Sequence, residues 1–348
     1  MPLHFRSIHE PQPGPSWKGR FDATWPGYQS WFLRQGEQAR PTYAACAAAL
    51  RRYMPELVPT WERLTELAGG GDHVARMLSL YRPTPYVACE QPATYGVGCS
   101  QAILERGPDG PVLVRNYDYV PALCEAVLLS SAWSGTRVIA MSDCLWGVID
   151  GVNDRGLTAS LTFGGRSVLG DGFGMPLILR YILETCGSTR DAVAVLERVP
   201  SHMAYNVMLL DRSGRFATVE VAPDHPVRVT RDRVTTNHQR AGADNPALTQ
   251  TVERRRVLES CVASRVVSRA ALVGTFLSAP VYNADHALGL GTLYTAVYEP
   301  RAGRMQLVWP DREWKRSFEV FEEAAHEATY LAASGTGLAA AAPAVSAA

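Results

Sequence analysis

One of the seven cysteines is followed by an arginine and an aspartate at a spacing that suits nucleophilic chemistry. Cys99 comes directly after Gly98, Arg115 lies sixteen residues later, and Asp118 follows three residues after that. A thiol needs a nearby cation to ionise and a base to accept its proton. If the chain is cut between Gly98 and Cys99, the freed α-amino group, whose ordinary pKa is about 8, can act as that base.

The residues between the cysteine and the aspartate predict a β-hairpin. Residues 102–105 and 111–114 are typical of two short strands, and the Gly-Pro-Asp-Gly sequence at 107–110 is typical of the turn between them. A hairpin of this length brings its far end back beside its start. The thiol, the guanidinium and the carboxylate can therefore meet at one end of two paired strands.

Several motifs in a fixed order resemble a known family. They are Arg76-Met-Leu-Ser, Gly98-Cys-Ser, Arg115-Asn-Tyr-Asp, Gly151-Val-Asn-Asp-Arg-Gly-Leu, Phe163-Gly-Gly-Arg, Thr235-Thr-Asn-His and Gly291-Thr-Leu-Tyr-Thr-Ala-Val-Tyr. With this order and spacing the sequence resembles the cysteine N-terminal-nucleophile hydrolases, and among them the isopenicillin N acyltransferase and β-alanyl-amine hydrolase family. Choloylglycine and penicillin V hydrolases are more distant relatives. The resemblance extends over residues 77–309.

The resemblance implies a maturation step and a set of catalytic residues. The chain would be a zymogen that cuts itself after Gly98, which makes Cys99 the N-terminal nucleophile. In the mature enzyme Asp118 would orient the α-amino group and Arg115 would hold the thiolate and lower its pKa. The resemblance also places a catalytic asparagine at Asn237, as a hydrogen-bond donor to the oxyanion.

Two further residues are weaker candidates for contact with the substrate or the oxyanion. Arg254 lies where relatives carry a site arginine, but Arg255 and Arg256 leave the register open, and a solvated helix face is an equal alternative. Thr162 is the candidate for a second oxyanion donor. Relatives similar to bile-salt hydrolases carry an asparagine near this place, and this chain does not.

Each candidate also has a purely structural explanation. Cys99 can be a buried structural cysteine, and Asn237 can be a turn residue. Arg115 and Asp118 can form a surface ion pair at a turn, which contributes little to stability. His238 would be the base of an ordinary cysteine–histidine hydrolase. A free N-terminal amine removes the need for such a base, so we interpret His238 as a packing or turn residue.

Composition fits an enzyme and argues against several other classes of protein. The 348 residues have a formal net charge of zero and are 47% hydrophobic, which is enough for a large core in one or two domains. The charge balance gives no reason to expect nucleic acid or an anionic membrane as a partner. No apolar run reaches the length of a membrane span and no signal peptide is evident, so we expect a cytoplasmic protein.

Cysteine usage bears on disulfides and metals. Seven is an odd number, and no Cys-x-x-Cys pair is present. This argues against a disulfide framework and against a structural zinc site. We therefore expect neither a metal nor another cofactor.

Local patterns change at the proposed cut, with helical signals before it and strand signals after it. Expected helices cover residues 43–53, 61–67, 73–80, 176–186, 189–199, 251–266 and 314–331. Expected strands beyond the hairpin cover residues 138–141, 146–150, 157–163, 205–211, 217–222, 227–230, 291–298 and 305–309.

Blocks of strands with helices between them indicate an α+β fold in which two stacked sheets are covered by helices. The resemblance implies the four-layer αββα sandwich of the N-terminal-nucleophile hydrolases. We expect residues 1–98 to form a helical pro-segment that becomes the small subunit of a heterodimer. Residues 99–334 would form the catalytic subunit, and residues 335–348, mostly Ala, Pro and Ser, a disordered tail.

The resemblance implies a self-processing amidohydrolase that cleaves a linear, non-peptide C–N amide bond through an acyl-cysteine at Cys99. Its substrate would be a small N-acyl amine or acyl thioester. An acyltransferase that moves an acyl group from a thioester or amide to an amine, such as a β-lactam nucleus, shares every step up to the acyl-enzyme. No nucleotide-binding motif marks a coenzyme A site, which favours hydrolysis. A second alternative is a self-processed protein that binds a ligand without turnover.

Overall fold

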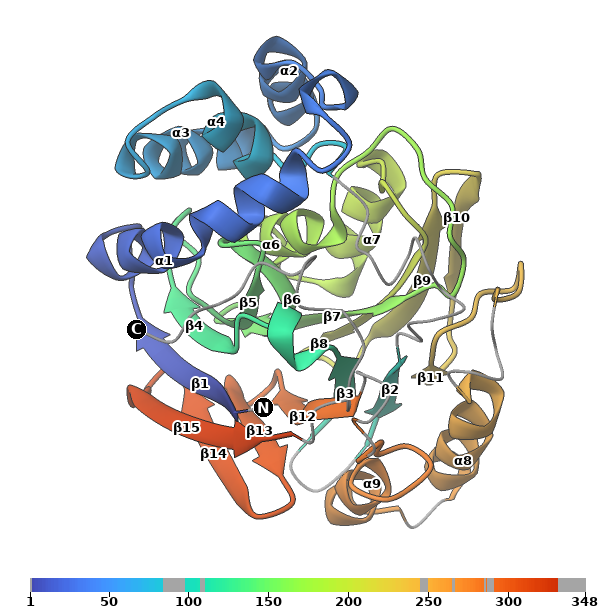
Figure 1. Cartoon of the computed structure of the whole chain (residues 1–348). Helices are drawn as coiled ribbons and strands as arrows, with labels where there is room; N and C mark the ends of the chain where they lie inside the picture. The colour runs from blue at the N-terminus through green and yellow to red at the C-terminus, as the bar shows by residue number, and fades with distance from the viewer. Residues whose placement is uncertain are drawn as a thin grey trace.

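Two β-sheets stack face to face, and helices cover their outer faces (Figure 1). The computed structural model describes residues 2–83, 98–106, 110–244, 250–264, 267–284, 286 and 291–330. Most of the expected turn at 107–110, and the whole of the expected tail at 335–348, lie outside the described residues.

The larger sheet has nine strands in the order β10-β9-β8-β7-β6-β5-β4-β1-β15. These strands are β1 (Pro2–His9), β4 (Val127–Ser131), β5 (Val138–Asp143), β6 (Gly147–Asn153), β7 (Leu157–Phe163), β8 (Tyr205–Asp211), β9 (Phe216–Ala222), β10 (His225–Thr230) and β15 (Ala324–Thr329). The strands from β4 to β8 are buried along their whole length, because both faces of this part of the sheet are covered.

The smaller sheet has six strands in the order β11-β2-β3-β12-β13-β14. These strands are β2 (Gly98–Leu104), β3 (Val112–Tyr119), β11 (Val234–Thr235), β12 (Gly291–Glu299), β13 (Arg304–Trp309) and β14 (Arg312–Ser317). The predicted hairpin is formed by β2 and β3, which pair antiparallel with Cys99 opposite Tyr117.

Helices cover the outer face of each sheet. Helices α6 (Met175–Thr185) and α7 (Thr189–Arg198) pack on the nine-stranded sheet, whereas α8 (Thr251–Ala263) and α9 (Arg269–Phe276) pack on β2 and β3 of the other (Figure 1). The two sheets meet where β2 contacts β7. The expected four-layer αββα sandwich is therefore confirmed.

The N-terminal segment adds helices beside α6 and α7 (Figure 1). They are α1 (Pro15–Phe32), α2 (Tyr43–Tyr53), α3 (Val58–Leu67) and α4 (Asp72–Leu78), with the short 3-10 turns η1 (Glu37–Ala39) and η2 (Pro55–Leu57). A further 3-10 turn, η3 (Pro121–Leu123), follows β3. Two buried tryptophans connect this segment to residues that follow the proposed cut. Trp17 Nε1 donates to the Leu145 carbonyl at 3.0 Å, and Trp146 Nε1 donates to the Leu78 carbonyl at 2.8 Å.

The N-terminal segment is not entirely helical, because its first strand lies inside the larger sheet. Strand β1 pairs in parallel with β4 and antiparallel with β15. Leu3, Phe5 and Ser7 are buried while the residues between them are exposed, which is the two-residue period of a strand. The segment before the proposed cut thus supplies an interior strand of the sheet, and β15 joins the sheet through it.

The expected helix over residues 314–331 is wrong. Strand β14 occupies its start and β15 most of its end. Trp314 and Arg316 are buried and alternate with exposed neighbours, so the register with β13 decides the conformation. In the Glu- and Ala-rich part, pairing with β1 overrides a local helical preference.

We expect the two fragments to stay together after a cut at Gly98, because separating them would remove β1 from between β4 and β15. Size-exclusion chromatography of the cleaved protein without denaturant should give one peak that contains both fragments. Residues 99–348 expressed alone should fail to fold. A soluble, monomeric and active 99–348 fragment would contradict this prediction.

Candidate active site

Cys99 lies near the start of β2, and its side chain is buried between the two sheets. From the neighbouring strand β3, Arg115 Nη2 lies 3.3 Å from Cys99 Sγ and donates a hydrogen bond to it. The structure thus places the Cys99 thiol and the Arg115 guanidinium side by side, as the spacing predicts. The hairpin register produces it, since Arg115 is opposite Gln101 and faces the same side of the sheet as Cys99.

The partner of Arg115 is an aspartate of the other sheet. The Arg115 guanidinium, which is 0% exposed, pairs with Asp150 of β6 and donates a bond of 3.3 Å to the Leu161 carbonyl of β7. The hydroxyls of Tyr294 and Tyr298 donate to the same carboxylate. The Arg115 guanidinium therefore connects the Cys99 thiol of the smaller sheet to the buried Asp150 carboxylate of the larger sheet.

The suggested surface ion pair between Arg115 and Asp118 does not form. Residues three apart on a strand point to opposite faces, so Arg115 faces the other sheet and Asp118 faces the side of α8. Thr292 donates to Asp118 Oδ1 at 2.7 Å, and Arg254 Nη1 lies 3.8 Å from Oδ2. Burial raises the pKa of Asp118 to about 6, although Arg254 and Thr292 oppose the rise.

The position of Asp118 leaves no room for a side chain at residue 98 unless the carboxylate shifts. A Cβ atom at residue 98 would lie 2.8 Å from Asp118 Oδ2, closer than real Cβ contacts allow. The backbone of Gly98 does not have a positive φ, so close approach rather than a left-handed conformation explains the glycine. The carboxylate thus lies beside the peptide bond that would be cut.

Burial dominates the ionisation of the thiol. It raises the pKa of Cys99, Arg115 opposes the rise, and Asp118 adds to it. Arg115 lowers the pKa of the Cys99 thiol as expected, but in the intact chain burial raises this pKa by more. For Arg115 itself, burial favours the neutral form, but the carboxylate of Asp150 prevails and raises the pKa above its ordinary value.

Asn237 holds the backbone nitrogen of Cys99. Its Oδ1 accepts from Cys99 N at 2.7 Å and from Arg254 Nη2 at 2.9 Å, while its Nδ2 donates to the Phe163 carbonyl at 3.1 Å. Two donors facing one atom and an acceptor facing the other fix the orientation of the amide. Nδ2 carries two hydrogens, and among the described residues the Phe163 carbonyl accepts one of them.

Arg254 belongs to the site, and the alternative of a solvated helix face is wrong for this residue. It is 2% exposed, and its Nη1 donates to the Cys99 carbonyl and to Ser100 Oγ, both at 2.7 Å. Arg255, by contrast, pairs with Glu259 at 2.6 Å on the outer side of α8. Burial lowers the pKa of Arg254, with Asp118 opposing.

Thr162 and His238 lie near the site without contacting the thiol. Thr162 Oγ1 donates to the Thr236 carbonyl at 3.2 Å, so its hydroxyl proton is engaged. Within the described part of the chain, His238 contacts Thr236, Thr251 and Arg255, not Cys99. Burial and then the charge of Arg255 lower the pKa of His238.

The sequence reasoning missed the residues that surround Arg115 and Asp118. Asp150, Tyr294, Tyr298 and Thr292 all lie in buried strands. A signal was available for Asp150, which is a charged residue at the end of the apolar run Trp146-Gly-Val-Ile. Buried charges in proteins are paired, so this residue calls for a cation.

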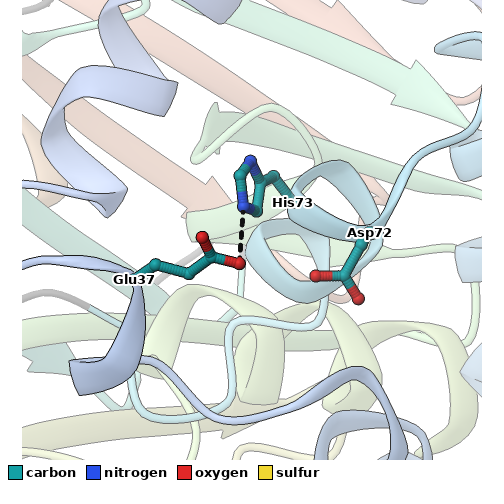
Figure 2. Close-up of side chains that lie close together, drawn as sticks. All are labelled: Glu37, Asp72 and His73. Carbon is teal, nitrogen blue, oxygen red and sulfur yellow. Dashed lines mark ion pairs between the residues drawn. The ribbon is translucent and has the colours of Figure 1, made fainter.

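Another group of ionisable side chains lies in the N-terminal segment (Figure 2). Glu37, Asp72 and His73 have possible ligand atoms within 4.8 Å of one another, and His73 Nε2 is 3.1 Å from Glu37 Oε1. Arg76 donates to Asp72 at 2.6 Å and to Glu37 at 3.2 Å. The arginine already balances the carboxylates, so we interpret the group as an ion-pair network that joins η1 to α4.

A family model matches residues 105–314, more than half of the chain. It describes the acyl-coenzyme A:6-aminopenicillanic acid acyl-transferase family. The chain belongs to this family. It is therefore an enzyme of an acyltransferase family. No curated protein gives a significant sequence match.

Solved structures with a resembling chain trace have low identity. Penicillin V acylase from Agrobacterium tumefaciens has a TM-score of 0.44 and 15% identity, covering 64% of this chain and 86% of that one. An N-acylethanolamine-hydrolyzing acid amidase ortholog from Caenorhabditis elegans has 0.45 and 15%, covering 67% and 100%. A mutant of conjugated bile acid hydrolase from Clostridium perfringens has 0.44 and 10%, covering 69% and 99%. The family assignment rests on the family model, not on these structures.

Among the helices that the structure describes, none is both long enough and apolar enough to cross a bilayer.

The buried pair gives a stability prediction. Asp150→Asn leaves the Arg115 guanidinium buried without its carboxylate, so we expect a loss of about 3–5 kcal/mol in the free energy of unfolding. Asp154→Asn is the matched control, since Asp154 pairs with the exposed Arg137, and it should cost less than about 1 kcal/mol. Urea denaturation measures both, and equal losses would contradict the assigned role of Asp150.

Asp118 gives a pH prediction. Its folded-state pKa of about 6 exceeds the ordinary 3.8, so its contribution to stability is complete below pH 4 and is lost as the pH rises through about 6. In a Cys99→Ala background, Asp118→Asn should therefore gain stability relative to its parent as the pH rises from 4 to 6. Urea denaturation at several pH values measures this, and a flat or opposite trend would refute the raised pKa.

Proposed function

We propose that this protein is a self-processing amidohydrolase that cleaves a linear, non-peptide C–N amide bond with Cys99 as its N-terminal nucleophile. The observation that carries the proposal is that both reactive atoms of this residue are held. Arg115 donates to Sγ, and Asn237 Oδ1 accepts from the nitrogen. Holding both atoms is useful when the nitrogen, once free, serves as the base for the sulfur.

Maturation is the first reaction. Cys99 Sγ attacks the Gly98 carbonyl carbon, the C–N bond between the two residues breaks, and the nitrogen takes up a proton to become an amine. Water then hydrolyses the thioester, which leaves a carboxylate on Gly98 and restores the thiol. Arg254 supports this step, because its Nη1 holds the Cys99 carbonyl and fixes the start of β2 while the bond before it changes.

Turnover uses the same residues. The free amine of Cys99 takes the thiol proton, the thiolate attacks the substrate carbonyl, and the amine returns the proton to the leaving nitrogen. Asn237 Oδ1 and Asp118 orient the amine, and the second hydrogen of Asn237 Nδ2 supplies a donor to the oxyanion. Thr162 is the weaker candidate for another donor, since its proton is engaged with Thr236. Water releases the acyl group from the sulfur.

Acyl transfer is the second candidate function, favoured by the description of the matching family model. It differs from hydrolysis in the last step, where an amine rather than water attacks the acyl-cysteine. The substrates are small N-acyl amines or acyl thioesters in either case. The partner of the catalytic subunit is its own cleaved 1–98 fragment, held through β1.

Self-processing has a direct test. A denaturing gel of the wild type should show two bands of about 11 and about 27 kDa in place of 38.0 kDa, while Cys99→Ala stays intact. Cys46→Ala is the matched control, since Cys46 is another buried free cysteine, and it should process normally. A wild type that stays whole under all conditions would remove the basis of the proposal.

Turnover is tested with a panel of N-acyl amines, penicillin V and acyl-coenzyme A thioesters, with and without an added amine. We expect free acid from at least one N-acyl amine, and none from the Cys99→Ala variant. If the amide of the added amine forms faster than free acid, the enzyme is an acyltransferase. If His238→Ala abolishes activity and unprocessed protein is active, a cysteine–histidine dyad replaces the proposed mechanism.

A further inference from the structure

Strand β12 donates hydrogen bonds to two buried aspartates on opposite faces of the smaller sheet. The hydroxyl of Tyr294 donates to Asp150 at 2.8 Å from the face that meets the larger sheet. The hydroxyl of Thr292 donates to Asp118 at 2.7 Å on the face towards α8. Residues two apart in a regular strand face the same side, so a regular β12 could not make both contacts.

A β-bulge in β12 makes both contacts possible. Thr292 is paired with Asp118 of β3, and Tyr294 is paired with the residue just before it. Leu293 is therefore an extra residue between two adjacent pairs. It reverses the alternation of faces and turns Thr292 towards Asp118. Bulges often re-aim a side chain next to an active site, so this one indicates a role for Thr292.

The direction of the Thr292 hydroxyl is fixed by backbone contacts. Asn283 N donates to Thr292 Oγ1 at 2.9 Å, and Thr292 N donates to the Asn283 carbonyl at 2.8 Å. A backbone N–H can only donate, so Oγ1 accepts there and its own hydrogen goes to Asp118 Oδ1. Thr292 is 0% exposed, so bulk water does not compete for this hydrogen.

The loop 277–283, which ends at Asn283, is attached to the same strand as Asp118. Asn116 Nδ2 donates to the carbonyls of Phe276 at 2.7 Å and Val281 at 3.1 Å. Asn116 precedes Asp118 by two residues on β3 and faces the same side of the sheet. One strand therefore holds both the carboxylate and the backbone that orients its hydrogen-bond donor.

The bond to Oδ1 determines where the other carboxylate oxygen lies. A Cβ atom on Gly98 would be 2.8 Å from Asp118 Oδ2, and Arg254 Nη1 is 3.8 Å from it. Oδ2 is therefore the oxygen beside the peptide bond between Gly98 and Cys99.

We propose that Thr292 is a positioning residue, which holds the Asp118 carboxylate by Oδ1 so that Oδ2 accepts a hydrogen from the freed amine of Cys99. The inference rests on the proposed function. A neutral amine has two hydrogens and one lone pair. With one hydrogen donated to Asn237 Oδ1 and the other to Asp118 Oδ2, the lone pair is left to take the thiol proton. The hydrogen bond from Thr292 also favours the ionised carboxylate that this step needs.

The first test measures the ionisation of Asp118 without any turnover. Cys99→Ala, which lacks the nucleophile, is isotope-labelled at the aspartate carboxyl carbons, and the Asp118 signal is identified by NMR from its loss in Asp118→Asn. Since the hydrogen bond favours the ionised form, adding Thr292→Val should move the titration midpoint upward by about one pH unit. Thr292→Ser keeps the hydroxyl and should titrate like its parent.

The groups around Asp118 allow a clear titration. Arg254 of α8 and Arg115 of the same strand lower its pKa, and arginine stays charged in proteins. Tyr282 faces it from the loop, and burial and then Asp118 raise the pKa of this tyrosine to about 12. The ring of His286 lies against the first residue of β12, but in the described part of the chain it is not among the groups that shift the pKa of Asp118. The Asp118 signal therefore reports its own ionisation.

Two further variants control for a folding defect. Thr292→Ala removes the same hydroxyl and should give the same upward shift. Thr158→Val is the matched control, since Thr158 is a fully buried strand threonine whose hydroxyl has no hydrogen-bond partner among the described residues. It should titrate like its parent. An unchanged midpoint in Thr292→Val and Thr292→Ala overturns the inference, even if the wild type is an active amidase.

Turnover distinguishes positioning from a structural role. With the N-acyl amine that the wild type hydrolyses fastest, Thr292→Val should lower kcat about tenfold at unchanged KM, and Thr292→Ser should retain kcat. A loss of kcat with an unchanged Asp118 midpoint would mean a structural role and overturns the inference. A raised midpoint in a protein whose wild type neither processes itself nor turns over an amide supports the action of Thr292 on Asp118 and counts against the proposed function.

Discussion

The Arg115 guanidinium, fully buried between the two sheets, is the constraint on which the rest of the site depends. A charge without water needs a counterion and several acceptors, and this one has Asp150, a backbone carbonyl and the Cys99 sulfur. Two of these acceptors belong to the larger sheet and one to the smaller sheet. Stacking of the two sheets therefore brings the Arg115 guanidinium to its counterion and acceptors. The same contacts fix the position of the Cys99 sulfur.

Cutting the chain would change the chemistry of the site more than its geometry. In the intact chain the nitrogen of Cys99 is an amide that can donate to Asn237 but cannot accept a proton, and burial keeps the thiol pKa high. A free amine at the same place would have the same oxygen within reach and could take the thiol proton. The close approach of Asp118 to Gly98 places a carboxylate beside this change.

Much of the fold and part of the site follow from local patterns in the sequence. The β2–β3 hairpin fixes its own register, so the approach of Arg115 to Cys99 was predictable from spacing alone. Strand β1 and the pairing of β15 depend on contacts more than 300 residues apart, for which no local pattern gives a partner. The role of Asp150 could not be predicted from local patterns either, because it pairs with Arg115 only when the two sheets stack. Arg254 is followed by two more arginines, and only the orientation of the helix decides which of the three faces the site.

In the proposed mechanism the sulfur of Cys99 carries the acyl group during turnover, on a residue whose amine is free. The most direct measurement is mass spectrometry of enzyme quenched in acid during turnover of an N-acyl amine. The account predicts that the large fragment gains the mass of the acyl group, and that proteolysis places it on a peptide whose first residue is Cys99. An acyl group on another residue, or on a chain still joined to Gly98, would contradict the account.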